Sequence, residues 1–196
     1  MDLAFDAEQG ASDEVLLIAY GNGDASAARI LMMRLTPRIL GFAARLLGGD
    51  RAEAEDVTQE AMLRLWKIAP EWRQGEAKVS TWLYRVVSNL CTDRLRRVRN
   101  VDLDSVAEPE DDSASAEQGL QQAARNAALN RALAELPERQ RQAVVLRHIE
   151  GLANPEIAAV MDIGVEAVES LTARGKRALA ALLAGRRAEL GYEDDG

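Results

Sequence analysis

Aromatic and cationic side chains alternate along the segment from Trp72 to Arg97. This combination is typical of single-stranded nucleic-acid binding, because bases stack on aromatic rings while guanidinium groups hold the phosphates. The candidate residues are Trp72, Lys78, Trp82, Arg85, Asn89, Arg94, Arg96 and Arg97. A structural role is the alternative interpretation, because Trp82 can be a core residue and arginines near a helix C-terminus favour the helix dipole without a ligand.

A second candidate site lies in the last third of the sequence. Asn154-Pro155 predicts a helix start, since Asn is a good N-cap and Pro suits the first helical position. Asp162-Ile163-Gly164 then predicts a turn before a longer helix that begins at Val165. This helix-turn-helix pattern places its second helix in the DNA major groove. The candidate DNA contacts on that helix are Glu166, Glu169, Ser170, Arg174, Lys176 and Arg177. Helical hairpins with glycine turns also occur without DNA, so the motif alone leaves a structural role open.

A third candidate surface lies on the predicted helix 51–68, which has two faces that call for burial. Spacings of three and four residues place Val57, Ala61, Leu65 and Ile68 on one face and Asp56, Gln59, Glu60, Leu63 and Trp66 on another. A small bundle cannot bury both faces of one helix. Either Trp66 and Leu63 are core residues beside a solvated acidic edge, or the second face docks on another protein.

The elements that position these residues are predicted to be helices, because aromatic residues make up only 4% of the chain and strong helix formers are plentiful. Ser12 and Asp24 are candidate N-caps, and Pro37 predicts a kink or a break within the second helix. The predicted helices are 13–20, 25–47, 51–68, 80–97, 129–136, 138–150, 155–162 and 165–183. We therefore expect an all-α fold.

The distribution of charge indicates two domains. The net charge is −8, yet residues 1–14, 102–117 and 188–196 hold five, seven and four acids and no base. The stretch 15–101 has 14 bases against 9 acids, and the stretch 118–187 has 10 bases against 7 acids. Two basic modules are thus flanked and joined by acidic segments. The predicted boundaries are a helical bundle at 10–99, a flexible acidic linker at 100–122, a helix-turn-helix domain at 123–187 and an acidic tail at 188–196.

Composition argues against several classes of protein. One Cys and one His cannot form a disulfide framework or an all-protein zinc site, so we expect no metal and no cofactor. No nucleophile, base and orienting group occur together, so we expect no enzymatic activity. The apolar stretches are too short to span a membrane and the N-terminus is acidic, which predicts a cytoplasmic protein without membrane insertion. Cys91 is expected to pack inside its helix rather than to act as a redox sensor.

Taken in order, these motifs resemble a bacterial sigma factor of the extracytoplasmic-function type, in the sigma-70 family. The resemblance is carried by RAEAEDVTQEAMLRLWK at 51–67, by the tryptophan- and arginine-containing segment 72–97, and by LAELPERQRQAVVLRHIEGLANPEIAAVMDIGVEAVESLTARGKRALAALL at 133–183. Two separate signatures appear in the right order with an acidic linker between them. The resemblance covers nearly the whole chain outside the termini.

The resemblance implies a transcription initiation subunit, active at the nucleoid, with helical regions 2 and 4. Core RNA polymerase is then the main partner, through its β′ clamp coiled coil and, for the apolar parts of 133–149, its β flap. The implied β′ contacts are Asp56, Gln59, Glu60, Met62 and Trp66. The segment 72–97 would open the minus-10 promoter element and hold a flipped base, and the helix from Val165 would read the minus-35 element. Promoter DNA and an anti-sigma factor are the other implied partners.

Two departures from the family pattern keep other hypotheses open. Glu169 and Leu171 stand where the family commonly has basic residues. A glutamate can accept a hydrogen bond from cytosine N4, so Glu169 can specify a base rather than repel DNA. The alternative is a sigma-like decoy that titrates an anti-sigma factor without initiating transcription. A free-standing helix-turn-helix repressor is a third hypothesis, but it leaves the first module without a purpose.

Overall fold

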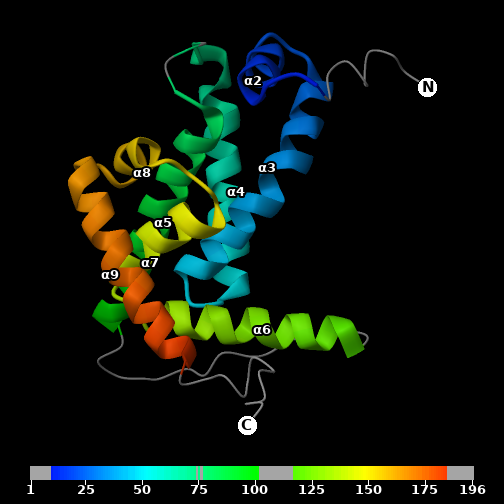
Figure 1. Ribbon diagram of the computed structural model, residues 1–196. Coiled ribbons are helices and arrows are strands. Elements are labelled where there is room, and N and C mark those ends of the chain that lie inside the picture. Colours follow the sequence, from blue (N-terminus) through cyan, green and yellow to red (C-terminus); the bar gives the residue numbers. More distant parts are fainter. Residues whose placement is uncertain (1–9, 74, 76, 102–116, 185–196) are drawn as a thin grey trace.

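The computed structural model describes residues 10–73, 75, 77–101 and 117–184, and in this part of the chain every regular element is a helix (Figure 1). The elements are α2 (Asp13–Gly21), α3 (Ala25–Leu46), α4 (Arg51–Ile68), the 3-10 turn η1 (Ala69–Glu71), α5 (Val79–Val101), α6 (Glu117–Ala134), α7 (Glu138–Val144), the π-helical turn η2 (Val145–Ile149), α8 (Asn154–Met161) and α9 (Val165–Ala184). The predicted all-α fold is confirmed. The predicted acidic tail and residues 102–116 of the predicted linker lie outside the described residues. The rest of the predicted flexible linker is helical instead, because α5 runs to Val101 and α6 begins at Glu117.

Short polar side chains cap the first three helices, as the sequence predicts for Ser12 and Asp24. Ser12 Oγ accepts from Val15 N at 3.4 Å, and Asp50 Oδ1 accepts from Glu53 N at 3.0 Å. Asp24 does the same for the first turn of α3. Each bond satisfies one of the amide groups that the first turn of a helix leaves without a partner. The predicted break at Pro37 is absent, since α3 continues through it as one helix.

Two local predictions in the C-terminal half are wrong. Asn154 is not the N-cap of α8, because Ala153 holds that position and Glu156 Oε2 accepts from its backbone N at 2.9 Å. This glutamate makes the back-reaching half of a capping box, which satisfies the backbone N–H of the cap residue itself. The helix predicted over 138–150 is also not uniform, since α7 passes into the π-helical turn η2 at Val145.

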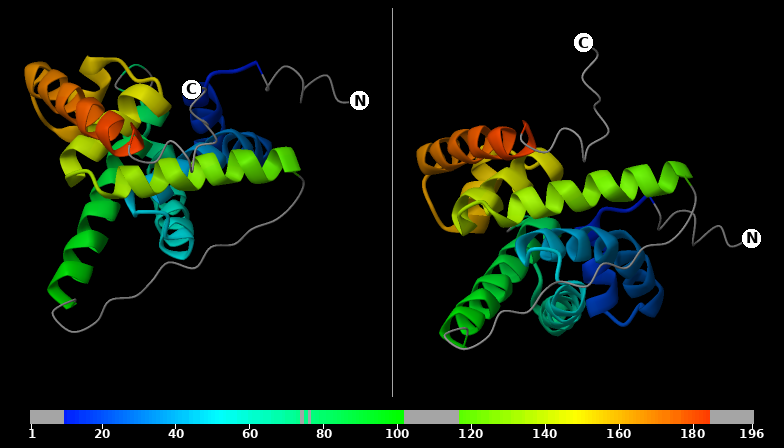
Figure 2. Two further views of the ribbon diagram at one scale, coloured as in Figure 1. Left: turned by 60° about the horizontal axis from the view of Figure 1, so that its bottom comes forward. Right: turned by 90° about the horizontal axis from the view of Figure 1, so that it is seen from below.

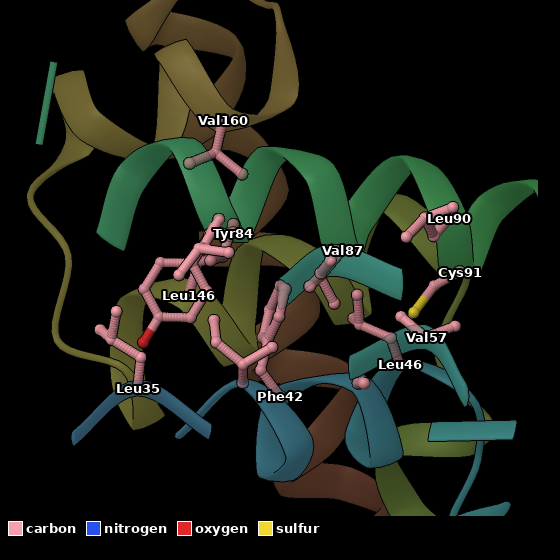
Figure 3. Packing of buried hydrophobic residues seen from close by; sticks show 14 of the residues in the cluster. Leu35, Phe42, Leu46, Val57, Tyr84, Val87, Leu90, Cys91, Leu146 and Val160 are labelled. Carbon is pink, nitrogen blue, oxygen red and sulfur yellow. The ribbon is translucent and has the colours of Figure 1, made fainter. Parts of the chain in front are cut away.

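Helices α2 to α5 enclose the core of the N-terminal module. Phe42 of α3 and Tyr84 of α5 meet edge to face, with ring centroids 4.9 Å apart and an interplanar angle of 81° (Figure 3). Leu46, Val57 and their neighbours fill the space between α3 and α4. Each such side chain contributes about 1.5–3 kcal/mol when it is fully buried. This core holds the two candidate helices α4 and α5 at a defined angle.

The C-terminal module packs against the N-terminal one, a contact that the sequence did not predict. Its helix α8 packs on α5, and α6 lies across α3 between the two groups of helices (Figure 2, right). One cluster of buried apolar residues includes side chains of both modules, and Leu146 lies beside Tyr84 (Figure 3). The described helices therefore form one body, although their motifs belong to two sequence modules.

Within the C-terminal module, α9 approaches α7 so closely that only glycine fits at position 175. A Cβ on Gly175 would lie 2.6 Å from Val144 Cγ2 and 3.0 Å from the Gln140 carbonyl oxygen. Glycine costs about 1 kcal/mol in a helix relative to alanine, so it needs such a reason here. Gly175 thus sets the distance between α9 and the rest of the module.

We predict that Gly175→Ala destabilises the protein by about 1–3 kcal/mol, because the added methyl forces the two helices apart. Urea unfolding at constant temperature measures this change. Gly164→Ala is the control, since a Cβ there meets nothing within 4 Å, and it should cost no more than about 1 kcal/mol, the loss of a glycine at the N-cap of α9. Stabilisation by Gly175→Ala would show that the helix pair adjusts and that the close approach is not required.

Candidate nucleic-acid and partner interfaces

The exposed face of α4 borders an apolar groove. The groove has a volume of about 310 Å³ and lies between α3 and α4. Its lining residues are Met32, Thr36, Leu40, Glu55, Thr58, Gln59, Met62, Leu63 and Trp66. Three of the residues predicted to bind the polymerase line this groove, namely Gln59, Met62 and Trp66. Met62 is buried, with 5% of its surface exposed. The rings of Trp66 and Tyr20 meet edge to face at 4.9 Å, so Trp66 is partly a core residue.

The rim of this groove exposes apolar side chains that the predicted site omits. Leu63 is 60% exposed and Met32 is 49% exposed. Asp56 and Glu60 lie on the same helix, with side chains 67% and 41% exposed. A monomer gains nothing from leaving large apolar side chains in water beside a groove, whereas a docked helix would bury them. The spacing of Leu63 signalled this face, but nothing in the sequence indicated that Met32 lies opposite it.

The two tryptophans of the candidate strand-binding segment pack together at the start of α5. Trp72 and Trp82 meet edge to face with centroids 6.1 Å apart. Both are half-buried, and the Trp72 indole Nε1 is buried without a hydrogen-bond partner. Each ring is therefore partly packed and partly accessible. Both roles considered for Trp82, packing in the core and stacking on a base, are compatible with this position.

Lys78, also in this segment, is in contact with the C-terminal module. Its Nζ donates to Glu156 Oε1 at 2.7 Å. This hydrogen bond is the main reason why the pKa of Lys78 is raised and the pKa of Glu156 is lowered from their usual values. Lys78 is thus not a free cation in this arrangement.

A polar cleft of about 490 Å³ separates α5 from α7 and α8. Arg85, Asn89 and Arg96 line it from α5, and Arg139 lines it from α7. The other lining residues are Ser88, Thr92, Glu138, Gln142, Val160, Met161 and Asp162. Arg97, by contrast, is exposed on the last turns of α5. The structure therefore brings three predicted strand-binding residues together and places the C-terminal module opposite them.

Arg94 faces α4 rather than solvent. Its guanidinium forms a short ion pair with Glu53 and lies 4.0 Å from Asp56 Oδ2 and 3.9 Å from Glu60 Oε2. The hydrogen bond to Glu53 is the main cause that raises the pKa of Arg94 further above its already high value. Only 23% of the side chain is exposed. In the arrangement described here, Arg94 ties α5 to the acidic face of α4.

The residues predicted to read the minus-35 element lie along the outer face of α9. Glu166, Glu169, Ser170, Arg174, Lys176 and Arg177 are all exposed. Asn154 Nδ2 donates to Glu169 Oε1 at 3.3 Å, and Arg174 Nη2 donates to Ser170 Oγ at 2.8 Å. Asp162, in the left-handed conformation at φ 53°, turns the chain from α8 into α9. These contacts orient two polar side chains on a surface that nothing else in the described chain covers.

The described residues show no group of side chains that could hold a metal ion. Among them, no helix is both long and apolar enough to cross a lipid bilayer. Cys91 is buried on α5 with 1% of its surface exposed, and burial raises the pKa of its thiol to about 12.

Two family models match the sequence, and each covers one module. The model described as Sigma-70 region 2 matches residues 31–101, and the model described as Sigma-70, region 4 matches residues 126–179. The first match contains α4 and α5, and the second contains α8 and the part of α9 up to residue 179.

The sequence is similar to curated sigma factors over most of its length. It is 36% identical to the ECF RNA polymerase sigma factor SigM of Mycobacterium tuberculosis strain H37Rv over 175 residues, which is 88% of this chain and 85% of the relative. It is 32% identical to the RNA polymerase sigma-H factor of Pseudomonas aeruginosa over 178 residues, covering 85% of this chain and 91% of the relative.

Solved structures share the fold. CnrH, solved in complex with the cytosolic domain of CnrY, matches with a TM-score of 0.65 and 26% identity over 89% of this chain and 99% of that one. The sigma factor RpoE of Bartonella quintana, solved in complex with the anti-sigma factor NepR, matches with a TM-score of 0.62 and 22% identity over 80% of this chain and 96% of that one.

We predict that Cys91 resists alkylation in the folded protein. With a thiol pKa of about 12, only about one thiol in ten thousand is ionised at pH 8, and the thiolate is the reactive form. The rate of reaction with iodoacetamide should rise about tenfold per pH unit between pH 7 and 9 and remain at least about 100-fold below that of the urea-unfolded chain. Rapid modification of the native thiol at pH 7 would instead support a redox-sensing role.

Proposed function

This chain belongs to the extracytoplasmic-function sigma factors of the sigma-70 family, and from that premise we propose how its surfaces divide the work of promoter-specific initiation. As an alternative sigma factor it is a transcription initiation factor. The α4 groove binds core RNA polymerase, α5 with its preceding loop engages the minus-10 element, and α9 reads the minus-35 element. The single observation that carries this assignment is the exposed apolar groove between α3 and α4 beside an acidic helix face.

Polymerase docking combines apolar burial with polar selectivity. A helix of the β′ clamp coiled coil, laid in the groove, covers Leu63 and Met32 and reaches Gln59. Asp56 and Glu60 on the same face supply negative charge, which attracts a basic partner surface and sets the orientation of docking. Met62 forms the floor and Trp66 the wall, so these two residues shape the groove more than they touch the partner.

Promoter melting belongs to α5 and the loop before it. Extruding a base costs a few kcal/mol, and stacking on an aromatic ring returns about 1–3 kcal/mol per base. Trp72 and Trp82 are the aromatic surfaces available for this, with Asn89 as a polar contact. Arg85, Arg96, Arg97 and Lys78 bind the phosphates, which adds affinity without sequence information.

Recognition of the minus-35 element belongs to α9, where Glu169 is held by Asn154. An oriented carboxylate can accept a hydrogen bond from cytosine N4, which gives base selectivity of about 1–3 kcal/mol. Arg174, Lys176 and Arg177 further along the helix hold the phosphates. The apolar parts of 133–149 contact the β flap.

We further propose that an anti-sigma factor holds this protein inactive in the cytoplasm, as part of a stress response. A sigma factor of related fold has been solved in complex with an anti-sigma factor. Release then allows the protein to join the polymerase at the nucleoid.

The experiment that tests the proposal is genomic run-off transcription with purified core polymerase and the full chain. Discrete start sites that share two upstream elements are expected. If the chain binds polymerase but opens no promoter on any genomic template, the decoy hypothesis replaces this proposal.

We predict that Leu63→Ala weakens core polymerase binding about 10- to 100-fold, because it removes an exposed anchor from the groove. Met33→Ala is the matched control, since Met33 is 55% exposed on α3 but does not line the groove. Titration of labelled sigma factor with core polymerase measures both. Equal affinities for the two variants would place the docking surface elsewhere.

We predict that Arg94→Gln leaves the salt dependence of promoter binding by the holoenzyme unchanged, because Arg94 is paired with α4 and not with phosphate. Arg97→Gln should reduce the slope of log K against log salt by about 0.7–0.9, the loss of one phosphate contact. Fluorescence anisotropy on a promoter fragment over a salt series gives both slopes. A reduced slope for Arg94→Gln would show that Arg94 contacts a DNA phosphate, as its position in the sequence suggests.

A further inference from the structure

The sulfur-containing side chains of this protein differ sharply in exposure. The chain has five methionines and one cysteine, and all of them except Met1 lie in the described part of the chain. Cys91 is 1% exposed, and burial raises the pKa of its thiol to about 12, so it is neither accessible nor ionised at neutral pH. Met62 and Met161 are 5% and 8% exposed. These three sulfur atoms are therefore protected from oxidants in solution.

The exposed methionines are adjacent residues of α3. Met32 is 49% exposed and Met33 is 55% exposed. Within the described ranges, no other sulfur-containing side chain is exposed. Exposed methionine is readily oxidised to methionine sulfoxide. An oxidant that meets the folded protein thus finds accessible sulfur on a single turn of α3.

The two exposed methionines have different surroundings. Met32 lines the groove between α3 and α4, where Leu63 and Trp66 of α4 also contribute to the lining. Met33 does not line this groove, because consecutive residues of a helix point about 100° apart. The pair therefore has similar exposure and the same chemistry, but only Met32 belongs to the proposed polymerase docking surface.

Oxidation changes the thioether of Met32 into a polar group. The sulfur lone pair attacks one oxygen of hydrogen peroxide, and the O–O bond breaks. The hydroxide that leaves takes the proton of the transferred hydroxyl and becomes water. Sulfur loses two electrons, which the peroxide gains, and the product is methionine sulfoxide. Its S=O group is a hydrogen-bond acceptor at a place where the native side chain is apolar and adaptable.

The sulfoxide matters more in the docked state than in the free protein. In the free protein Met32 is half exposed, so the new oxygen stays hydrated and the core is not disturbed. A helix docked in the groove would cover it against Leu63, and burial of a polar group without a hydrogen bond is costly. Gln59 is an exposed donor among the lining residues, but an amide that turns to the sulfoxide is lost to the partner. Either outcome weakens docking.

We propose that Met32 is a site of reversible oxidation by peroxide, and that its sulfoxide form binds core polymerase weakly. Peroxide then lowers the share of polymerase that carries this factor, and methionine sulfoxide reductases restore it. No cysteine takes part. The inference rests on the proposed function, because it takes the groove between α3 and α4 as the docking face.

Peptide mapping by mass spectrometry tests the oxidation site without the polymerase. The folded full chain is treated with hydrogen peroxide, and the sulfoxide fraction of each methionine is followed over time. Met32 and Met33 should react at rates within about threefold of each other and at least about tenfold faster than Met62 and Met161, since the oxidant must reach the sulfur. In urea these four rates should converge. Equal rates at Met32 and Met62 in the folded protein overturn the inference.

Two single variants assign the effect on docking to one methionine. Met33→Leu leaves Met32 as the exposed methionine of α3, and Met32→Leu leaves Met33, while leucine keeps a similar volume without sulfur. Each variant is compared with its own peroxide-treated form, so the readout is the ratio of the two affinities for core polymerase. Peroxide should weaken binding about 5- to 50-fold in the unsubstituted chain and in Met33→Leu, and less than about twofold in Met32→Leu.

Enzymatic reduction separates the sulfoxide from other damage. Methionine sulfoxide reductases A and B, which act on the two sulfoxide epimers, should return the oxidised Met33→Leu protein to within about twofold of its untreated affinity. A loss that persists after complete reduction, or an equal loss in Met32→Leu, overturns the inference. If the untreated chain does not bind core polymerase, the proposed function fails and the docking effect fails with it. The untreated sample thus distinguishes the two failures.

Discussion

The arrangement of the described helices depends on one buried carboxylate, that of Glu150. Glu150 follows η2 in the C-terminal module, and its carboxylate lies between Tyr84 and Arg45 of the N-terminal module. Apolar contacts such as Leu146 beside Tyr84 add burial but little direction, whereas a charge with two fixed partners defines how α7 and α8 lie over α5. The contact is also reversible, because a carboxylate that leaves this site is simply hydrated.

This placement gives the three candidate surfaces different accessibility. The proposed docking groove of α4 and the outer face of α9 are open, while α7 and α8 lie opposite α5 across a polar cleft in which Arg85, Asn89 and Arg96 stay exposed. The acidic face of α4 also contributes within the module, because Glu53, Asp56 and Glu60 surround Arg94 and tie α4 to α5.

Local chemistry made much of this fold predictable. The bounds of α4 follow from Asp50 and the proline at position 70, and the turn between α8 and α9 follows from Asp162-Ile163-Gly164. Two predictions about individual side chains failed. Glu156 replaces Asn154 in capping α8, and Arg94 turns to α4 instead of solvent. The partners of Arg94 cannot be recognised from spacing along one helix, since they depend on how α4 and α5 pack, whereas Glu156 lies three residues after the cap and is a local signal that the sequence-based prediction missed. The contact between modules has the same origin: its glutamates are spread from position 138 to 156 and have no local pattern.

The most direct test of the central claim is the distance between the modules, measured by pulsed electron paramagnetic resonance with one spin label on α5 and one on α9. In the free protein the labels should give a narrow distribution near the closed separation of about 20–30 Å, which allows for the length of the labels. In a promoter complex with core polymerase the distance should lengthen towards about 85 Å, beyond the reach of the closed form. A broad, long distribution in the free protein, or the same short distance in both states, would contradict the account.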